Sequence, residues 1–323
     1  MKDRRKRDIN YLRISVTDLC NLRCQYCMPE EGVVKKRHED LLTLEEIYQV
    51  VEACVALGIH KIRITGGEPL IRKGIIGLIE RISQIEAIQD LAMTTNGILL
   101  KKYAKDLKKA GLNRVNISLD SLDEEKYRRI TRGGNLKEVL QGIEAAKEEG
   151  LFPIKLNVVL IDELNSDEIL DFAMWTMEEP IEIRFIELMP IGQAASWAKN
   201  NFVSNEFVKM KLKELIPLEP EDRSSPARYY KLPGAKGKIG LINPISSHFC
   251  MYCNRIRMTA DGKLKPCLHS NQEIDIKQIL RTEGTPSSIE NVIKEAILLK
   301  PMKHTLNERD HEPIIRDMIQ IGG

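Results

Sequence analysis

The stretch Cys20-Asn-Leu-Arg-Cys24-Gln-Tyr-Cys27 spaces three cysteines as C-x3-C-x2-C directly after the strand-like run 11–16. Three thiolates on one short loop can bind a metal centre. They are one short of the four that a closed zinc site or a fully cysteine-ligated iron–sulfur cluster uses. A four-iron cluster on three cysteines would leave one iron open to a further ligand. A structural zinc site completed by a distant ligand such as His38 is the alternative on spacing alone.

The composition indicates an ordinary globular protein. Of 323 residues, 42% are hydrophobic and 30% charged, and the length accommodates a barrel-sized domain with a smaller unit. No apolar run approaches the ~18 residues of a membrane span. The basic residues 1–7 are followed by polar residues rather than by the apolar core of a signal peptide. We therefore expect a cytoplasmic protein that neither spans nor binds a membrane.

The cysteines favour a reducing compartment, where clustered thiols bind metal rather than form disulfides. Six of the seven fall into two triplets, and Cys54 lies on the apolar face of a predicted helix as a small buried residue. The formal net charge of +2 gives no extended basic field, so nucleic-acid binding is not expected. The basic N-terminal run is interpreted as a frayed, solvated end.

Strand and helix patterns alternate along the first two thirds of the chain. The predicted strands are 11–16, 61–65, 90–94, 114–118, 154–159 and 181–187. The predicted helices are 44–57, which begins with a Thr43/Glu46 capping box, and 75–85, 101–110, 136–149 and 166–177. Six successive β–α repeats predict an α/β fold with a parallel sheet. We divide the chain into a barrel domain, 1–220, and a smaller lobe, 221–323, which begins with β-like segments.

Charged residues interrupt several predicted strands, although a parallel sheet covered on both faces would be almost wholly apolar. These residues are Arg13, Lys61, Arg63, Lys155 and Arg184. A period of two places each charge on one face, and in an α/β barrel the face that helices leave uncovered is the lumen. A cationic lumen predicts a phosphate-bearing ligand. Internal ion pairs with Glu68, Glu182 and Glu187 are the alternative for part of these cations.

A second triplet, Cys250-Met-Tyr-Cys253 and Cys267, surrounds a predicted hairpin turn at Asp261-Gly262, with His248 and His269 as flanking residues. Three cysteines, a histidine and a hairpin are also typical of a zinc ribbon. No fourth cysteine completes such a ribbon. Arg255 and Arg257 follow the loop two residues apart, so both side chains would lie on the same face of a strand. Arginines beside a metal with a free position favour a substrate clamp.

Together these segments resemble the radical S-adenosylmethionine (SAM) enzymes and, within them, the GTP 3′,8-cyclase family of molybdenum cofactor biosynthesis. The resemblance rests on the first cysteine loop after Arg13-Ile-Ser-Val-Thr-Asp, on Arg63-Ile-Thr-Gly-Gly-Glu-Pro, on the second triplet with Asn-Arg-Ile-Arg, and on terminal Gly322-Gly323. It covers nearly the whole chain. It implies an incomplete (βα)6 TIM-like barrel closed by a C-terminal α+β lobe, with a [4Fe-4S] cluster at each end of the lumen.

The resemblance also implies roles for individual residues. The two clusters would be held by Cys20, Cys24 and Cys27 and by Cys250, Cys253 and Cys267. SAM would contact Tyr26, Gly66, Gly67, Glu68, Ser118 and Met189. GTP would contact Arg13, Arg63, Thr94, Lys155, Arg255 and Arg257, to which the charge pattern adds Lys61 and Arg184. Catalysis would involve Arg255 and the tail Gly322-Gly323.

The implied reaction joins C3′ of GTP to guanine C8, giving (8S)-3′,8-cyclo-7,8-dihydroguanosine 5′-triphosphate. The implied partners are GTP, an electron donor such as a flavodoxin or ferredoxin, the next enzyme of molybdopterin synthesis, and a second copy of the chain in a homodimer. Two alternatives stay open on the sequence. They are a radical SAM peptide-modifying enzyme with an auxiliary cluster, and a zinc-ribbon nucleic-acid-binding protein.

Overall fold

One curved sheet organises the computed structural model, which describes residues 1–306, 308 and 311–322. Its strand order is β12-β11-β10-β1-β2-β3-β4-β5-β6-β9-β8-β7. The strands are β1 (Tyr11–Ser15), β2 (Lys61–Thr65), β3 (Asp90–Thr95), β4 (Arg114–Ser118), β5 (Lys155–Leu160), β6 (Glu182–Glu187), β7 (Ile216–Pro217), β8 (Ala227–Lys231), β9 (Lys238–Ile242), β10 (Arg255–Met258), β11 (Lys263–Lys265) and β12 (Ile274–Asp275).

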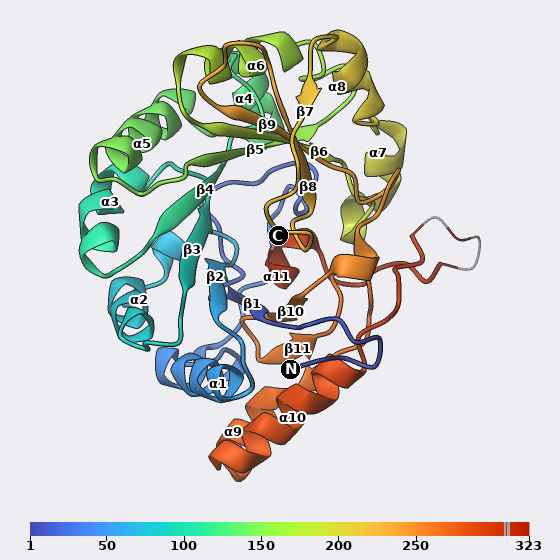
Figure 1. Cartoon of the computed structure of the whole chain (residues 1–323). Coiled ribbons are helices and arrows are strands. Elements are labelled where there is room, and N and C mark those ends of the chain that lie inside the picture. Colours follow the sequence, from blue (N-terminus) through green and yellow to red (C-terminus); the bar gives the residue numbers. More distant parts are fainter. Residues whose placement is uncertain (307, 309–310, 323) are drawn as a thin grey trace.

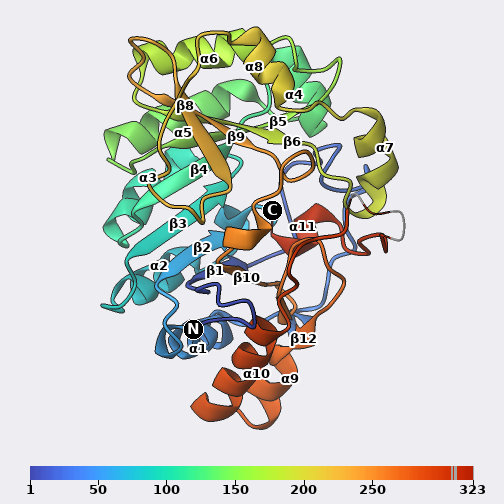
Figure 2. The ribbon, with the colours of Figure 1, turned by 45° about the vertical axis from the view of Figure 1, so that its right-hand side comes forward.

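Helices surround this sheet on its outer side, as Figure 1 shows for α1 to α6. The helices are α1 (Leu44–Ala56), α2 (Ile75–Ser83), α3 (Leu100–Lys109), α4 (Glu124–Thr131), α5 (Leu136–Glu148), α6 (Ile169–Glu178), α7 (Ala195–Asn200), α8 (Glu206–Lys211), α9 (Ile276–Thr282), α10 (Pro286–Leu298) and α11 (Met318–Ile321). Helix α11 is the exception, since Figures 1 and 2 both place it inside the ring of strands.

The parallel part of the sheet contains more than the six predicted strands. β9 pairs in parallel with β6 at one side, and β10 pairs in parallel with β1 at the other. Both belong to the C-terminal third of the chain, so the expected lobe extends the barrel sheet with its own strands. The sequence did not predict this pairing because partners far apart in the chain leave no local pattern.

The period-two prediction for the strands is confirmed. In β1, Leu12 and Ile14 are fully buried in the main core, whereas Tyr11 and Arg13 line the cavities described below. Arg13 lies beside Arg63 of β2 and Arg257 of β10 in the sheet register. Apolar residues therefore pack against the helices while charged residues gather on the inner face.

The predicted helices and strands of the repeats are confirmed to within three residues at their ends. The capping box of α1 is present, with Glu46 N donating to Thr43 Oγ1 at 3.1 Å and Thr43 N donating to Glu46 Oε2 at 2.8 Å. Cys54 is fully buried, as expected. Helices α4, α7, α9, α10 and α11 were not predicted.

The interpretation of the N-terminus as frayed is wrong. Arg7 is buried and donates from Nε to Asp3 Oδ2 at 2.7 Å. It also donates to the carbonyl oxygens of Cys250, at 2.8 Å, and Pro301, at 2.7 Å. This arginine attaches the basic N-terminal segment to the second cysteine loop, which is why the segment is ordered. Across the described ranges, no helix combines the length and apolarity that a bilayer crossing requires.

Candidate functional site

Three adjoining cavities occupy the inside of the sheet. The upper cavity, about 260 Å³, lies at the carboxyl ends of the strands and is lined by all three thiols of the first triplet. The lower cavity, about 200 Å³, lies at the amino ends of the strands. A third, the second-thiol cavity of about 70 Å³, is lined by Cys250, Cys253 and Cys267. Arg255 lines all three, so one side chain connects the two thiol triplets and the space between them.

The first triplet lies on the loop after β1, where parallel-strand sites form. Burial raises the pKa of all three thiols, and the neighbouring thiols add to the effect at Cys24 and Cys27. Asn96 Nδ2 approaches Cys20 Sγ at 3.7 Å. A cationic metal centre would reverse this pKa shift, since metal-bound thiols are deprotonated.

The glycine pair after β2 fits closely under the first triplet. A Cβ on Gly67 would lie 2.1 Å from the carbonyl oxygen of Leu19, and one on Gly66 would lie 2.7 Å from that of Thr17. Gly67 N donates to the same Thr17 oxygen at 2.6 Å. Only glycine lets this backbone pass so near the cysteine loop.

The other predicted SAM contacts divide into two groups. Tyr26, Ser118 and Met189 line the upper cavity, and the Tyr26 hydroxyl donates to Asp120 Oδ2 at 2.7 Å. Glu68 is buried outside the cavity lining, where its carboxylate accepts from Thr95 Oγ1 and from Asn96 N, both at 2.8 Å. Burial raises the pKa of Glu68 to about 7. In this structure Glu68 therefore supports the turn after β3.

Arginines from neighbouring strands meet between the thiol triplets. Arg13, Arg63 and Arg257 all line the upper cavity, together with Arg184 and Arg255. Burial, together with neighbouring guanidinium groups, lowers the pKa of Arg63 and Arg257 to about 10. Cations held this close in a buried space favour binding of an anion.

The lower cavity contains acids as well as cations. Glu182 forms ion pairs with Lys155 at 2.7 Å and with Arg184 at 3.4 Å. Lys61 pairs with Asp222 at 3.0 Å, on the loop between β7 and β8. Burial, then repulsion by Arg184, lowers the pKa of Lys155 to about 8 in spite of Glu182. The ion-pair alternative is therefore correct for the cations that Glu182 binds.

Glu68 and Glu187, the other two acids of that alternative, have different partners. Glu187 accepts from the backbone nitrogens of Ile245 at 3.0 Å and Ser246 at 2.9 Å, and Glu68 accepts from the groups named above. Polar atoms that lack a hydrogen-bond partner in the described part of the chain also face this region. They are Arg63 Nε, Thr94 Oγ1 and Asn157 Oδ1. Buried polar atoms are rarely left unpaired, so they fit a polar ligand.

The second triplet surrounds its own cavity. The predicted hairpin is confirmed, with β10 and β11 antiparallel and Gly262 at a positive φ of 75°. Although burial alone raises the pKa of Cys253, the charges of Lys300 and Arg255 lower it to about 7. In the described chain, no three Cys, His, Asp or Glu side chains converge closely enough to hold a single metal ion. The three thiols instead line the wall of one cavity, which fits a larger group such as a cluster.

Comparisons with known proteins agree with this geometry. Residues 14–176 match the radical SAM superfamily, and residues 181–306 match the family described as Molybdenum Cofactor Synthesis C. A protein of Alkaliphilus metalliredigens named GTP 3′,8-cyclase is 60% identical over 323 residues, covering 100% of both chains. The cyclase of Peptoclostridium acidaminophilum is 54% identical over 98% of this chain and 96% of its own. The chain belongs to the GTP 3′,8-cyclase family.

Solved structures bear out the radical SAM fold. SuiB of Streptococcus suis, bound to its precursor peptide SuiA, gives a TM-score of 0.62 at 13% identity over 98% of this chain and 77% of its own. SuiB bound to SAM gives 0.61 at 14% identity over 97% of this chain and 78% of its own. At this identity the likeness concerns the fold alone. Family membership decides against the peptide-modifying and zinc-ribbon alternatives.

Membership in the family implies a [4Fe-4S] cluster and SAM as cofactors. The first triplet fits the cluster, because three thiols and no fourth cysteine line the upper cavity. The strand charges predicted a cationic lumen from the sequence, and the arginines that line the upper cavity confirm that prediction.

The C-terminal segment of this cyclase-family chain enters the upper cavity. Met318 and Ile319 of α11 form part of its wall, and the carbonyl oxygen of Gly322 accepts from Arg257 Nη1 at 2.6 Å. A Cβ on Gly322 would lie 2.4 Å from Thr65 Oγ1, and the residue has a φ of 77°. The predicted role of Gly323 lies outside the described residues.

Some lining residues were missed by the sequence reasoning. Asn157 lies two residues after Lys155 on β5, so the period of two could have identified it. Tyr229 accepts from Arg184 Nε at 2.8 Å, but its strand, β8, carries no comparable charge pattern. His269 Nε2 lies 3.2 Å from Met189 Sδ. From the sequence, His269 was identified only as a residue that flanks the second triplet.

Proposed function

We propose that this chain catalyses the conversion of GTP to (8S)-3′,8-cyclo-7,8-dihydroguanosine 5′-triphosphate, the first step of molybdenum cofactor biosynthesis. Full-length identity to proteins named GTP 3′,8-cyclase supports the reaction. One structural observation supports assigning this reaction to particular residues. Arg13, Arg63 and Arg257, from three adjacent strands, line the space between the two thiol triplets, where a triphosphate nucleotide can reach both.

The first triplet would hold a [4Fe-4S] cluster, and Tyr26, Gly66, Gly67, Ser118 and Met189 would surround SAM. When bound, these cofactors supply the carbon radical that removes a hydrogen atom from C3′ of the ribose. Glu68 would act indirectly, because its carboxylate holds the turn at Thr95 and Asn96 rather than the cavity wall.

The second triplet would hold another [4Fe-4S] cluster, which would offer a free coordination position to the guanine. Cys250, Cys253 and Cys267 offer three thiols around one cavity, and Arg255 and Arg257 extend from that cavity toward the lumen. The phosphates would then lie among Arg13, Lys61, Arg63, Lys155 and Arg184, with Thr94 as a neutral donor. Ion pairs such as Lys155–Glu182 and Lys61–Asp222 would rearrange when the anion enters.

The protein's part in the reaction is orientation. The ribose C3′ must stay close to guanine C8 until the new bond forms, and water must be kept away. Met318, Ile319 and the Gly322 backbone cover one wall of the upper cavity and suit this purpose. We assign Gly322 to this covering tail, and the catalytic role of Gly323 stays a prediction.

Arg255 is the proposed catalytic residue nearest the guanine. Its Nη2 donates to the Ser224 carbonyl at 2.7 Å, and its guanidinium lies 5.2 Å from the ring centre of Phe249. Replacement by alanine, with both clusters retained, should leave 5′-deoxyadenosine release but abolish cyclised nucleotide. An unchanged product yield would refute the assignment.

The reaction needs partners that we also propose. These are a flavodoxin or ferredoxin as electron donor, the next enzyme of molybdopterin synthesis as recipient of the product, and a homodimer as the assembly. We also propose that the two parts of the chain that meet at residue 220 have different roles. Residues 1–220 would hold SAM, and residues 221–323 would hold the guanine.

Two measurements on protein purified without oxygen test the function. Iron and zinc are counted per chain, and the protein is incubated with GTP, SAM and a reductant. About eight irons with negligible zinc, and cyclised nucleotide, are expected. About four irons with one zinc would leave radical chemistry but remove guanine recognition by a second cluster.

A further inference from the structure

Lys300 is a buried lysine beside the second-thiol cavity. It is 7% exposed, follows α10 and lines the cavity together with Cys250, Cys253 and Cys267. Its Nζ donates to the carbonyl oxygen of Arg255 at 2.6 Å and to that of Pro266 at 2.8 Å. These two carbonyls belong to the strand after Cys253 and to the residue before Cys267, so the ammonium is fixed between the two ends of the triplet.

Within the described part of the chain, this ammonium has no carboxylate to compensate its charge. Among residues 1–306, 308 and 311–322, no ion pair joins Lys300 to an acidic side chain. Two neutral carbonyls cannot balance a buried unit charge, and such a charge is costly unless an anion is near. The groups around the cavity that can become anionic are the three thiols.

Lys265 provides the contrast within the same lobe. Its side chain is 1% exposed, but its Nζ lies 2.9 Å from Glu273 Oε1, and Glu273 is also bound by Arg316. The charge of this buried lysine is thus compensated by a carboxylate. Lys300 lacks that compensation and faces the thiols.

We propose that Lys300 is the fixed counter-charge of the second [4Fe-4S] cluster and sets the reduction potential of that cluster. The inference rests on the proposed function, since it requires a cluster at this triplet. Reduction adds one electron to a centre that three thiolates already make negative. A cation at the cavity wall stabilises the added charge.

The test uses the full-length holoprotein and an anaerobic redox titration followed by electron paramagnetic resonance. Lys300→Gln removes the charge but keeps hydrogen-bond donors, and Lys300→Met removes both. Lys300→Arg retains the charge. Lys265→Met is the matched control, because it also removes a buried lysine of this lobe, but a carboxylate-paired one.

At the potential where the parent's second cluster is half reduced, the reduced-to-oxidised ratio should fall about tenfold in Lys300→Gln and Lys300→Met, which is about 59 mV for one electron. Lys300→Arg and Lys265→Met should stay near the parent ratio, and the first cluster should titrate unchanged in every variant. A folded charge-removing variant with the parent ratio, or an equal fall in Lys265→Met, overturns the role of Lys300. If the parent contains zinc or no metal at this triplet, both this role and the second cluster of the proposed function are overturned. Iron counting on the parent distinguishes that outcome from a failure of Lys300 alone.

Discussion

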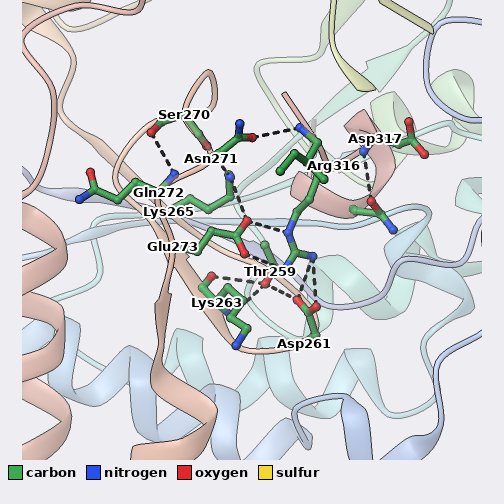
Figure 3. A network of polar contacts seen from close by, with 12 residues as sticks. Thr259, Asp261, Lys263, Lys265, Ser270, Asn271, Gln272, Glu273, Arg316 and Asp317 are labelled. Carbon is green, nitrogen blue, oxygen red and sulfur yellow. Dashed lines mark hydrogen bonds and ion pairs between the residues drawn. The ribbon is translucent and has the colours of Figure 1, made fainter. Parts of the chain in front are cut away.

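Replacing Arg316 by glutamine should detach the C-terminal tail from the site. Arg316 is the anchor of the segment that leads into α11, and Figure 3 shows its guanidinium between two acids. Nε and Nη2 donate to the two oxygens of Glu273 at 2.6 and 2.8 Å, and Nη1 contacts both oxygens of Asp261 at 3.2 and 3.1 Å. Both acids have another cation, since Lys36 reaches Asp261 at 2.5 Å and Lys265 reaches Glu273 at 2.9 Å. After the substitution, each carboxylate therefore still has a cationic partner. The free energy that is lost is that of attaching the tail.

The size of the effect follows from the kind of bond lost. Hydrogen bonds to charged groups contribute about 1.5–3 kcal/mol each, and partial exposure reduces this. Two such pairs, with side chains 15–19% exposed, give about 2–4 kcal/mol. That is roughly a 30- to 1,000-fold fall in the ratio of attached to detached tails, at about 1.4 kcal/mol per factor of ten.

Two measurements test separately whether the tail is attached and whether its attachment matters for the reaction. Carboxypeptidase digestion, read by intact mass, should remove tail residues faster from Arg316→Gln than from the parent. The ratio of cyclised nucleotide to 5′-deoxyadenosine should fall severalfold, because Arg257 loses the Gly322 carbonyl and the cavity loses the wall formed by Met318. Arg281→Gln is the control, since Arg281 also makes a two-pronged ion pair, with Glu46, but away from the cavity. If Arg316→Gln keeps both the parent's digestion rate and its product ratio, the reasoning about the anchor is refuted.

Three further changes test other parts of the site. Asp222→Asn removes the acid that occupies Lys61 and should tighten GTP binding by up to about fivefold, as for a partly exposed pair of about 1 kcal/mol; calorimetry that finds equal or weaker binding contradicts this. The pKa of Lys155 is lowered to about 8, so its charge is lost as the pH rises through that value, and GTP affinity should fall between pH 7 and pH 9; a flat profile, or the same fall in Lys155→Met, would remove Lys155 as its cause. Gly67→Ala would force a Cβ to 2.1 Å from the carbonyl oxygen of Leu19, so the first cluster should be lost while the second keeps its iron. Iron analysis with spectroscopy of each cluster would measure this loss. A full complement of iron in the variant would count against the close fit.

The repeats could be predicted from the sequence because their signals are local. In a strand such as β2, the period of two is visible within five residues. In α1, Thr43 and Glu46 indicate where the helix begins. The same period identified Arg13 and Arg63 as residues of the inner face, since the direction of a side chain follows from its place in the strand. The cysteine spacings likewise fall within short loops.

The remaining features depend on contacts between distant parts of the chain. Asp222 lies in an irregular loop, so nothing nearby in sequence indicates that it meets Lys61. Arg7 appears in the sequence as one of several N-terminal cations, and only the folded chain brings it to the carbonyls of Cys250 and Pro301. Glu68 belongs to a segment that is recognisable in the sequence, but only the folded chain shows that its carboxylate binds Thr95 and Asn96, and its contact with SAM stays a prediction.

The pairing of β10 with β1 has a consequence for synthesis on the ribosome. Tyr11 lies opposite Arg255, which follows it by 244 positions (255 − 11). At roughly 5–20 residues per second, one edge of the first strand stays uncovered for roughly 12–50 seconds after it is made. An open edge next to a loop with three free thiols is exposed to wrong pairing throughout that interval. The oldest strand of the nascent chain is thus among the last to be completed, and its open edge is a liability for misfolding until residue 255 emerges.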